Sequence, residues 1–126
     1  MKTAAQLTRK EIEAYRRSFR KAREQESLEL HQRRERAWSL ARQAGEILKE
    51  RYEVSRVVVF GSLAGKHMFT MWSDVDLAAW GLRPEDTFRA MGEIYYLDEE
   101  IVVNLVDVNT ARPSIINTIE KDGIEI

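Results

Sequence analysis

"VVVFGSLAGKHMFTMWSDVDLAAWG" (residues 57–81) contains two apolar runs joined by a connector. The first run is β-branched or aromatic throughout and stops at Gly61, which is typical of a strand buried on both faces. The second run, "SDVDLAAW", predicts another strand, in which alternation places Asp74 and Asp76 on one face. We therefore expect two strands, with a turn at Gly61 and Ser62 after the first.

The region before this stretch predicts a long charged helix. Residues 8–52 contain no proline and one glycine, and helix-forming residues dominate. Apolar residues recur at helical spacing near its start and again from residue 38, so the later part is expected to pack on the core. The earlier part either projects or folds back after a break near residues 24–28. If it projects, its partial apolar stripe of Tyr15, Phe19 and Leu28 is a candidate contact surface for a partner protein or for a second copy, which would be a homodimer through this helix.

The region after this stretch predicts two more helices and one more strand. Pro84 is suited to the first turn of a helix (residues 84–96), "EIVVNLVDV" predicts a strand (residues 100–108), and Pro113 begins a last helix that ends near Lys121. The expected buried face of the first of these helices consists of Phe88, Met91, Ile94 and Tyr95. The fold class is therefore α+β, with a mixed sheet of three or four strands whose one face is covered by helices. We interpret the chain as one domain, a helical extension (1–52) packed on a core (53–126).

Composition excludes several kinds of site. The chain has 126 residues and no cysteine, so disulfides, thiolate metal sites and cysteine nucleophiles are absent. No apolar stretch is long enough to cross a bilayer, and the first ten residues lack the apolar segment of a signal peptide, so we predict a cytoplasmic protein.

Charge is divided between the two parts of the chain. Residues 1–52 carry 14 Lys and Arg against 8 Asp and Glu, whereas residues 53–126 carry 6 against 13. We interpret the basic part, including Arg33, Arg34 and Arg36, as a solvated helix surface rather than as a nucleic-acid site.

Asp74 and Asp76 indicate a cation site. Two desolvated carboxylates on one strand face repel each other, and a bound cation relieves that repulsion. Oxygen ligands favour Mg²⁺, which retains room for substrate phosphates. The Gly61 backbone permits close approach, and the Ser62 hydroxyl can hold phosphate oxygens. Together these residues predict a site for a Mg²⁺-bound nucleotide.

Two further kinds of residue bear on such a site. Lys66 and Arg56 are candidate triphosphate contacts because of their charge alone. Trp72 and Trp80 flank the strand that carries the aspartates. A nucleobase could stack on one of them, but we interpret both as core residues.

The quoted stretch resembles the signature of the minimal nucleotidyltransferases of the polymerase-beta superfamily, in which a glycine-serine turn precedes an Asp-x-Asp strand. The likeness extends over residues 56–108, and the charged helix before it resembles bacterial members that are paired with HEPN-type toxins. The resemblance implies the nucleotidyltransferase fold, binding of Mg²⁺ and ATP or another nucleoside triphosphate, and transfer of a nucleoside monophosphate to a hydroxyl. It also implies an antitoxin that adenylylates its toxin partner.

The resemblance assigns roles to individual residues. Gly61 and Ser62 would hold the triphosphate, Asp74 and Asp76 would bind metal, and Asn104 would occupy the place of the third catalytic carboxylate. An asparagine carbonyl can coordinate a metal, but it brings no charge and cannot accept a proton from the acceptor hydroxyl. We therefore expect reduced or lost transfer activity.

Two other functions stay open. A small-molecule acceptor such as an aminoglycoside would keep the chemistry, although so short a chain leaves few residues to build an acceptor pocket. Alternatively, the chain is a non-catalytic antitoxin that only binds its partner, which is the reading that Asn104 favours.

Overall fold

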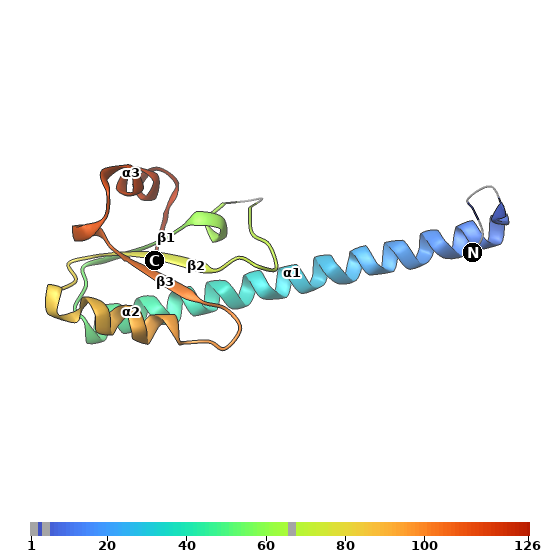
Figure 1. Cartoon of the computed structure of the whole chain (residues 1–126). Coiled ribbons are helices and arrows are strands. Elements are labelled where there is room, and N and C mark those ends of the chain that lie inside the picture. The colour runs from blue at the N-terminus through green and yellow to red at the C-terminus, as the bar shows by residue number, and fades with distance from the viewer. Residues whose placement is uncertain (1–2, 4–5, 66–67) are drawn as a thin grey trace. The chain divides into compact units, whose positions relative to one another are not determined.

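The computed structural model describes residues 3, 6–65 and 68–126. These residues form two compact units, Met1–Gln32 and Arg33–Ile126. Helix α1 (Arg9–Arg51) begins in the first unit and ends in the second (Figure 1). Because α1 is continuous, the long helix is confirmed and the alternative of a break near residues 24–28 is wrong.

The first unit consists mainly of the start of α1. Three of its large apolar side chains are exposed, namely Tyr15 (75%), Phe19 (60%) and Leu28 (50%). The buried residues of α1 begin only at Ala37, in the second unit. No described helix of the chain carries an apolar window long enough to cross a membrane.

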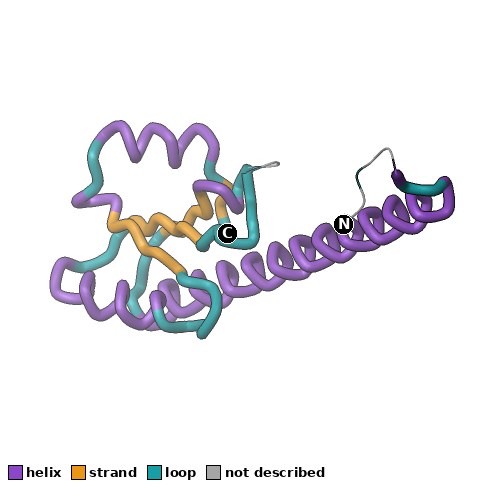
Figure 2. The backbone as a smooth tube through the Cα atoms, turned by 45° about the vertical axis from the view of Figure 1, so that its right-hand side comes forward, coloured by secondary structure: helices purple, strands orange, loops and turns teal. Residues whose placement is uncertain are grey.

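The second unit is built on a four-stranded mixed sheet with the order β3-β2-β1-β4 (Figure 2). β1 (Arg56–Phe60) is antiparallel to β2 (Val75–Trp80), and β2 is parallel to β3 (Val103–Asp107). β4 (Ile124–Glu125) adds a short antiparallel edge beside β1, which no local sequence pattern predicts. The predicted α+β class and mixed sheet are confirmed.

Helices cover both faces of this sheet. The second part of α1 lies on the Val57 face, together with α2 (Thr87–Tyr95), whereas α3 (Pro113–Asp122) lies on the opposite face (Figure 1). The side chain of Ile119 on α3 forms a buried cluster with Val58 and Ala78. The expectation that helices cover only one face is wrong: Val57, Val58 and Val59 follow one another in β1 and so point to opposite faces in turn, yet all three are buried.

The buried face of α2 differs from the prediction. Ile94 is buried as expected, but the second fully buried residue is Ala90, while Phe88 is 87% exposed. Residues Pro84–Asp86 form a 3-10 turn, so the α-helix starts only at Thr87. Phe88 lies six residues before Ile94, which is about 120° around the axis of an α-helix, so a buried face formed by Ala90 and Ile94 leaves Phe88 on the outside.

The loop between α2 and β3 is held by Asp98, whose side chain is 7% exposed. One carboxylate oxygen accepts hydrogen bonds from the backbone N–H groups of Glu100 (3.0 Å) and Ile101 (2.9 Å), and the other pairs with Arg36 of α1. The hydrogen bond from Arg36 is the main reason why the pKa of Asp98 lies below its ordinary value.

An Asp98→Ala variant is expected to lose about 1–2 kcal/mol of unfolding free energy at pH 7, because two backbone donors lose their acceptor. Since the pKa of Asp98 is lowered by folding, its stabilisation is present above the unfolded pKa of about 4 and disappears as pH falls through the folded pKa. Urea denaturation at pH 7 and pH 3 measures this. The exposed neighbour Glu99, changed to Ala, is the control, and a deficit equal at both pH values would contradict the assignment.

Candidate active site

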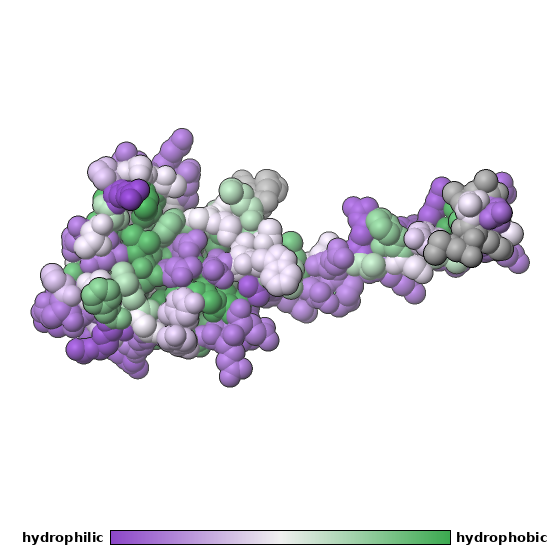
Figure 3. Space-filling view, viewed as in Figure 1, coloured by the Kyte–Doolittle hydropathy of each residue, from purple (hydrophilic) through white to green (hydrophobic). Residues whose placement is uncertain are grey.

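Strand register brings two of the predicted site residues together. Asp76 of β2 lies opposite Phe60 of β1 on one side and opposite Asn104 of β3 on the other. The side-chain amide of Asn104 donates a hydrogen bond from Nδ2 to Oδ1 of Asp76 at 3.2 Å. These three residues form a row across the sheet, on the face that also carries Val58, Ala78 and α3. Figure 3 shows hydrophilic and hydrophobic residues side by side on the visible face of the second unit.

Gly61 places the turn after β1 directly against Asp76. Its φ of +72° is one that glycine adopts readily, and a Cβ atom at this position would lie 2.5 Å from Oδ2 of Asp76. Ser62 follows in the 3-10 turn Gly61–Leu63 and is half-buried. The structure therefore brings the candidate phosphate-binding turn and a candidate metal ligand into contact.

A Gly61→Ala variant is expected to lose about 1–3 kcal/mol of unfolding free energy, because a methyl group is strained at positive φ and the Asp76 carboxylate must move. Displacement of Asp76 should also weaken any stabilisation by Mg²⁺ and ATP. Thermal unfolding with and without Mg²⁺-ATP tests both effects. Gly92→Ala is the matched control, because a Cβ at Gly92 meets nothing within 4 Å and alanine favours its helix. Equal stability of the two variants would contradict the tight contact at Gly61.

The environment of Asp76 is electrostatically unfavourable for its charge. Burial raises the pKa of the Asp76 carboxyl above its ordinary value, the hydrogen bond from Asn104 lowers it, and the negative charge of Asp74 raises it. Asp74 itself is exposed and lies just before β2. A cation between the two carboxylates would remove both unfavourable effects.

The donor set fits a hard cation. The described residues contain no group of three or more His, Asp or Glu side chains that could hold a metal ion. The candidate ligands are instead two carboxylates, Asp74 and Asp76, with the amide of Asn104 beside them. Mg²⁺ accepts such oxygens, retains waters and takes further ligands from substrate phosphates. Asn104 would have to turn its carbonyl oxygen toward the ion, since its Nδ2 now faces Asp76.

The connector between β1 and β2 is held by two arginines of α1. Arg34 donates to the carbonyl oxygens of Leu63 (3.2 Å) and Gly65 (3.3 Å), and Arg33 donates to that of Ser73 (2.9 Å). The interpretation of both arginines as a solvated surface is therefore wrong. Their partners are backbone atoms 29 to 40 residues away, which no local sequence pattern signals.

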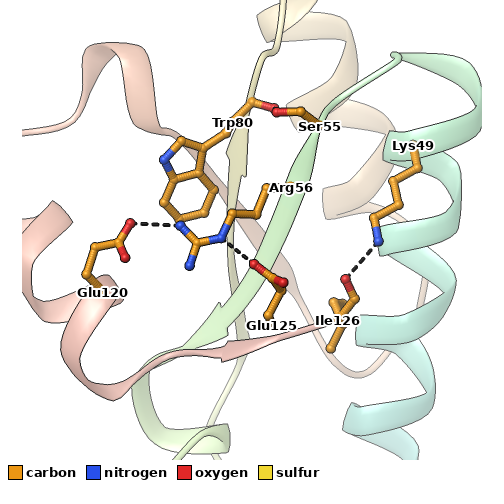
Figure 4. Close-up of polar contacts among 7 residues, drawn as sticks. All are labelled: Lys49, Ser55, Arg56, Trp80, Glu120, Glu125 and Ile126. Carbon is orange, nitrogen blue, oxygen red and sulfur yellow. Dashed lines mark hydrogen bonds and ion pairs between the residues drawn. The ribbon is translucent and has the colours of Figure 1, made fainter.

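The structure does not support the two other candidates, Lys66 and Arg56, as triphosphate contacts. Lys66 lies outside the described residues. Arg56 pairs with Glu120 (2.8 Å) and Glu125, and its guanidinium lies 4.3 Å from the ring centroid of Trp80 (Figure 4). Arg56 thus joins α3 and β4 to the sheet, and we do not retain it as a triphosphate contact.

Comparison with known proteins agrees with this geometry. Residues 42–126 match the family model described as "Polymerase beta, Nucleotidyltransferase". No curated protein sequence matches the chain. Among solved structures, one chain from a crystal structure of a mutant MntA-HpeT toxin-antitoxin is similar, with a TM-score of 0.54 and 18% identity over 68% of this chain and 69% of that chain. At 18% identity this similarity shows a shared fold and nothing more. Since the family model covers most of the chain, the protein belongs to the polymerase beta nucleotidyltransferase family.

Proposed function

We propose that this protein binds Mg²⁺ and ATP and transfers AMP to a hydroxyl of a partner toxin, for which it is the cytoplasmic antitoxin. Membership of the nucleotidyltransferase family supports the reaction class. The similar structure is titled as a toxin-antitoxin, which suggests the kind of partner. That the toxin is of the HEPN type rests on the resemblance of the charged helix described above.

The contact between Gly61 and Asp76 is the observation that carries this proposal. The turn at Gly61, for which we propose phosphate binding, lies beside the Asp76 carboxylate of β2. In the proposed site, Asp74 and Asp76 hold Mg²⁺, and the Ser62 hydroxyl donates to a phosphate oxygen. When bound, Mg²⁺ would neutralise the charge that develops as the acceptor hydroxyl oxygen bonds to the α-phosphorus of ATP and pyrophosphate leaves. The protein residues orient the triphosphate and keep it beside the metal ligands.

Asn104 limits the proposed reaction. Its amide donates to Asp76 and offers no basic group to take a proton from the acceptor hydroxyl. We therefore propose slow transfer. The lack of a basic group at Asn104 also favours a second candidate function, in which the chain binds nucleotide and toxin without catalysing transfer.

Co-expression with the protein encoded by the neighbouring gene tests the proposal. The expected result is thermal stabilisation of this chain by Mg²⁺ and ATP together, but by neither alone, and a mass increase of one AMP on the neighbour. Stabilisation and toxin neutralisation without that mass increase would establish the non-catalytic function. Transfer to an aminoglycoside instead would change the acceptor class, and absence of any nucleotide binding would refute the site.

The first unit offers a surface for the partner. Exposed Tyr15, Phe19 and Leu28 lie on a helix segment that is rich in Arg and Lys. We propose that this segment contacts the toxin. A Tyr15→Ser, Phe19→Ser double variant should then lower toxin affinity without altering ATP binding. Sedimentation of the chain alone tests the competing prediction that the helix forms a homodimer.

A further inference from the structure

A short turn directly before the candidate metal ligands is fixed by its own hydrogen bonds. The Thr70 N–H donates to Oγ of Ser73 (2.9 Å), the Trp72 N–H donates to Oγ1 of Thr70 (3.2 Å), and the Ser73 N–H donates to the Thr70 carbonyl (3.1 Å). Arg33 adds the hydrogen bond from α1 to the Ser73 carbonyl. The backbone on both sides of Trp72 is therefore held in place.

This fixed turn presents an indole ring to solvent. Trp72 is 90% exposed. By contrast, Phe69 in the same connector is 7% exposed, and Cζ of Arg34 lies 5.9 Å from the centroid of its ring. The interpretation of Trp72 as a core residue is therefore wrong. Exposing so large an apolar ring costs free energy, and the turn's hydrogen bonds do not use that side chain. An exposed ring on a rigid support is suited to binding a planar ligand.

The position of Trp72 distinguishes it from Trp80. Trp72 is two residues before Asp74, on the connector that leads from the Gly61–Leu63 turn to β2. Trp80 ends β2, four residues beyond Asp76, and its ring is occupied by Arg56. Of these two tryptophans, Trp72 is the one whose ring has no aromatic or cation contact among the described residues and which lies close in the chain to the candidate metal ligands.

From this juxtaposition we propose that the indole of Trp72 is the platform on which the nucleobase of the bound nucleotide stacks. The inference rests on the proposed function, because it assumes a triphosphate at Gly61 and Ser62. Base stacking on an aromatic side chain is tolerant of base identity. Trp72 would therefore make the protein bind any nucleoside triphosphate more tightly than inorganic triphosphate. It would not make the protein prefer one base to another.

Binding of two probes to purified full-length protein tests this platform. Mg²⁺-ATP contains the base, and inorganic tripolyphosphate with Mg²⁺ lacks it. In Trp72→Ala, the Kd for ATP should rise about fivefold or more, while the Kd for tripolyphosphate stays within about twofold. Trp72→Phe retains a ring and should lose less. Phe88→Ala removes an equally exposed aromatic ring (87%) from α2 and is the matched control.

Tryptophan fluorescence gives a second readout. ATP should quench emission in the unmodified chain and in Phe88→Ala, and this quenching should be absent in Trp72→Phe, where only half-buried Trp38 and Trp80 remain. Unchanged affinity for ATP in Trp72→Ala would overturn the proposal that Trp72 stacks on the base. If toxin modification nevertheless falls in that variant, the ring contacts the acceptor protein instead, and the proposal is overturned as well. If neither ATP nor tripolyphosphate binds the unmodified chain, the proposed function fails and the platform with it.

Discussion

An Asn104→Asp variant is expected to transfer AMP at least about 100-fold faster than the unmodified chain, because a carboxylate there can accept the proton of the acceptor hydroxyl. The register of β2 and β3 places this position opposite Asp76, within hydrogen-bonding distance of its carboxylate. A third negative charge would also bind Mg²⁺ more strongly. Transfer of labelled AMP to the purified partner measures the gain.

The same variant should be less stable than the unmodified chain when Mg²⁺ is absent. Asn104 now donates a hydrogen bond to Asp76, and the substituted carboxylate would repel it instead. Asn104→Ala is the control, since it removes the hydrogen bond without supplying a base and should show no gain in rate. Equal transfer by the Asn104→Asp variant and the unmodified chain would show that position 104 does not limit the reaction.

An Asp76→Asn variant is expected to reduce transfer on the order of 1,000-fold, since a metal ligand and its charge are lost. Stabilisation by Mg²⁺-ATP should disappear as well. Without ligands, however, the variant should melt at a higher temperature than the unmodified chain at pH 7. Burial makes ionised Asp76 costly, whereas an amide of the same shape carries no charge and still accepts the hydrogen bond from Asn104.

The pH dependence provides an independent check of the same side chain. Because folding raises the pKa of Asp76, its contribution to stability falls as pH rises from the unfolded pKa, about 4, through the folded pKa. The Asp76→Asn variant should lack this decline. Asp122→Asn, at an exposed carboxylate of α3, is the control. A ligand-free Asp76→Asn protein that melts below the unmodified chain would contradict the assigned cost of the buried charge.

Helical and strand periodicity in the sequence predicts the individual helices and strands correctly where the structure depends on neighbouring residues alone. The long helix, the buried strand before Gly61 and the alternation of the second strand follow from helix propensity and from the two-residue period of a strand. The strand alternation also predicts that Asp76 shares a strand face with Asp74, but it does not predict that this face is the one that α3 covers. Its proximity to Asn104 required the parallel pairing of β2 with β3, which is a long-range choice.

Other features depend on contacts that a local pattern does not contain. β4 is two residues long, and it exists because its backbone pairs with β1 and Arg56 binds Glu125. A charged helix residue such as Arg33 is predicted to lie at the surface, but its partner, the Ser73 carbonyl, is 40 residues away. An aromatic residue beside a strand, such as Trp72, is predicted to be core, but Trp72 lies in a turn that Thr70 and Ser73 close and is exposed.

The row Phe60, Asp76 and Asn104 makes the chemistry of this protein inseparable from the alignment of its strands. A slip of β2 by a single residue would turn Asp76 toward the packed side chains of α1 and would bring Val75 or Leu77, both now fully buried, to the surface beneath α3. Such a misaligned sheet would be apolar at the position that Asp76 now occupies, and would lack the proposed cation site. Binding of Mg²⁺ to that proposed site during refolding would therefore report when β1, β2 and β3 reach their native pairing.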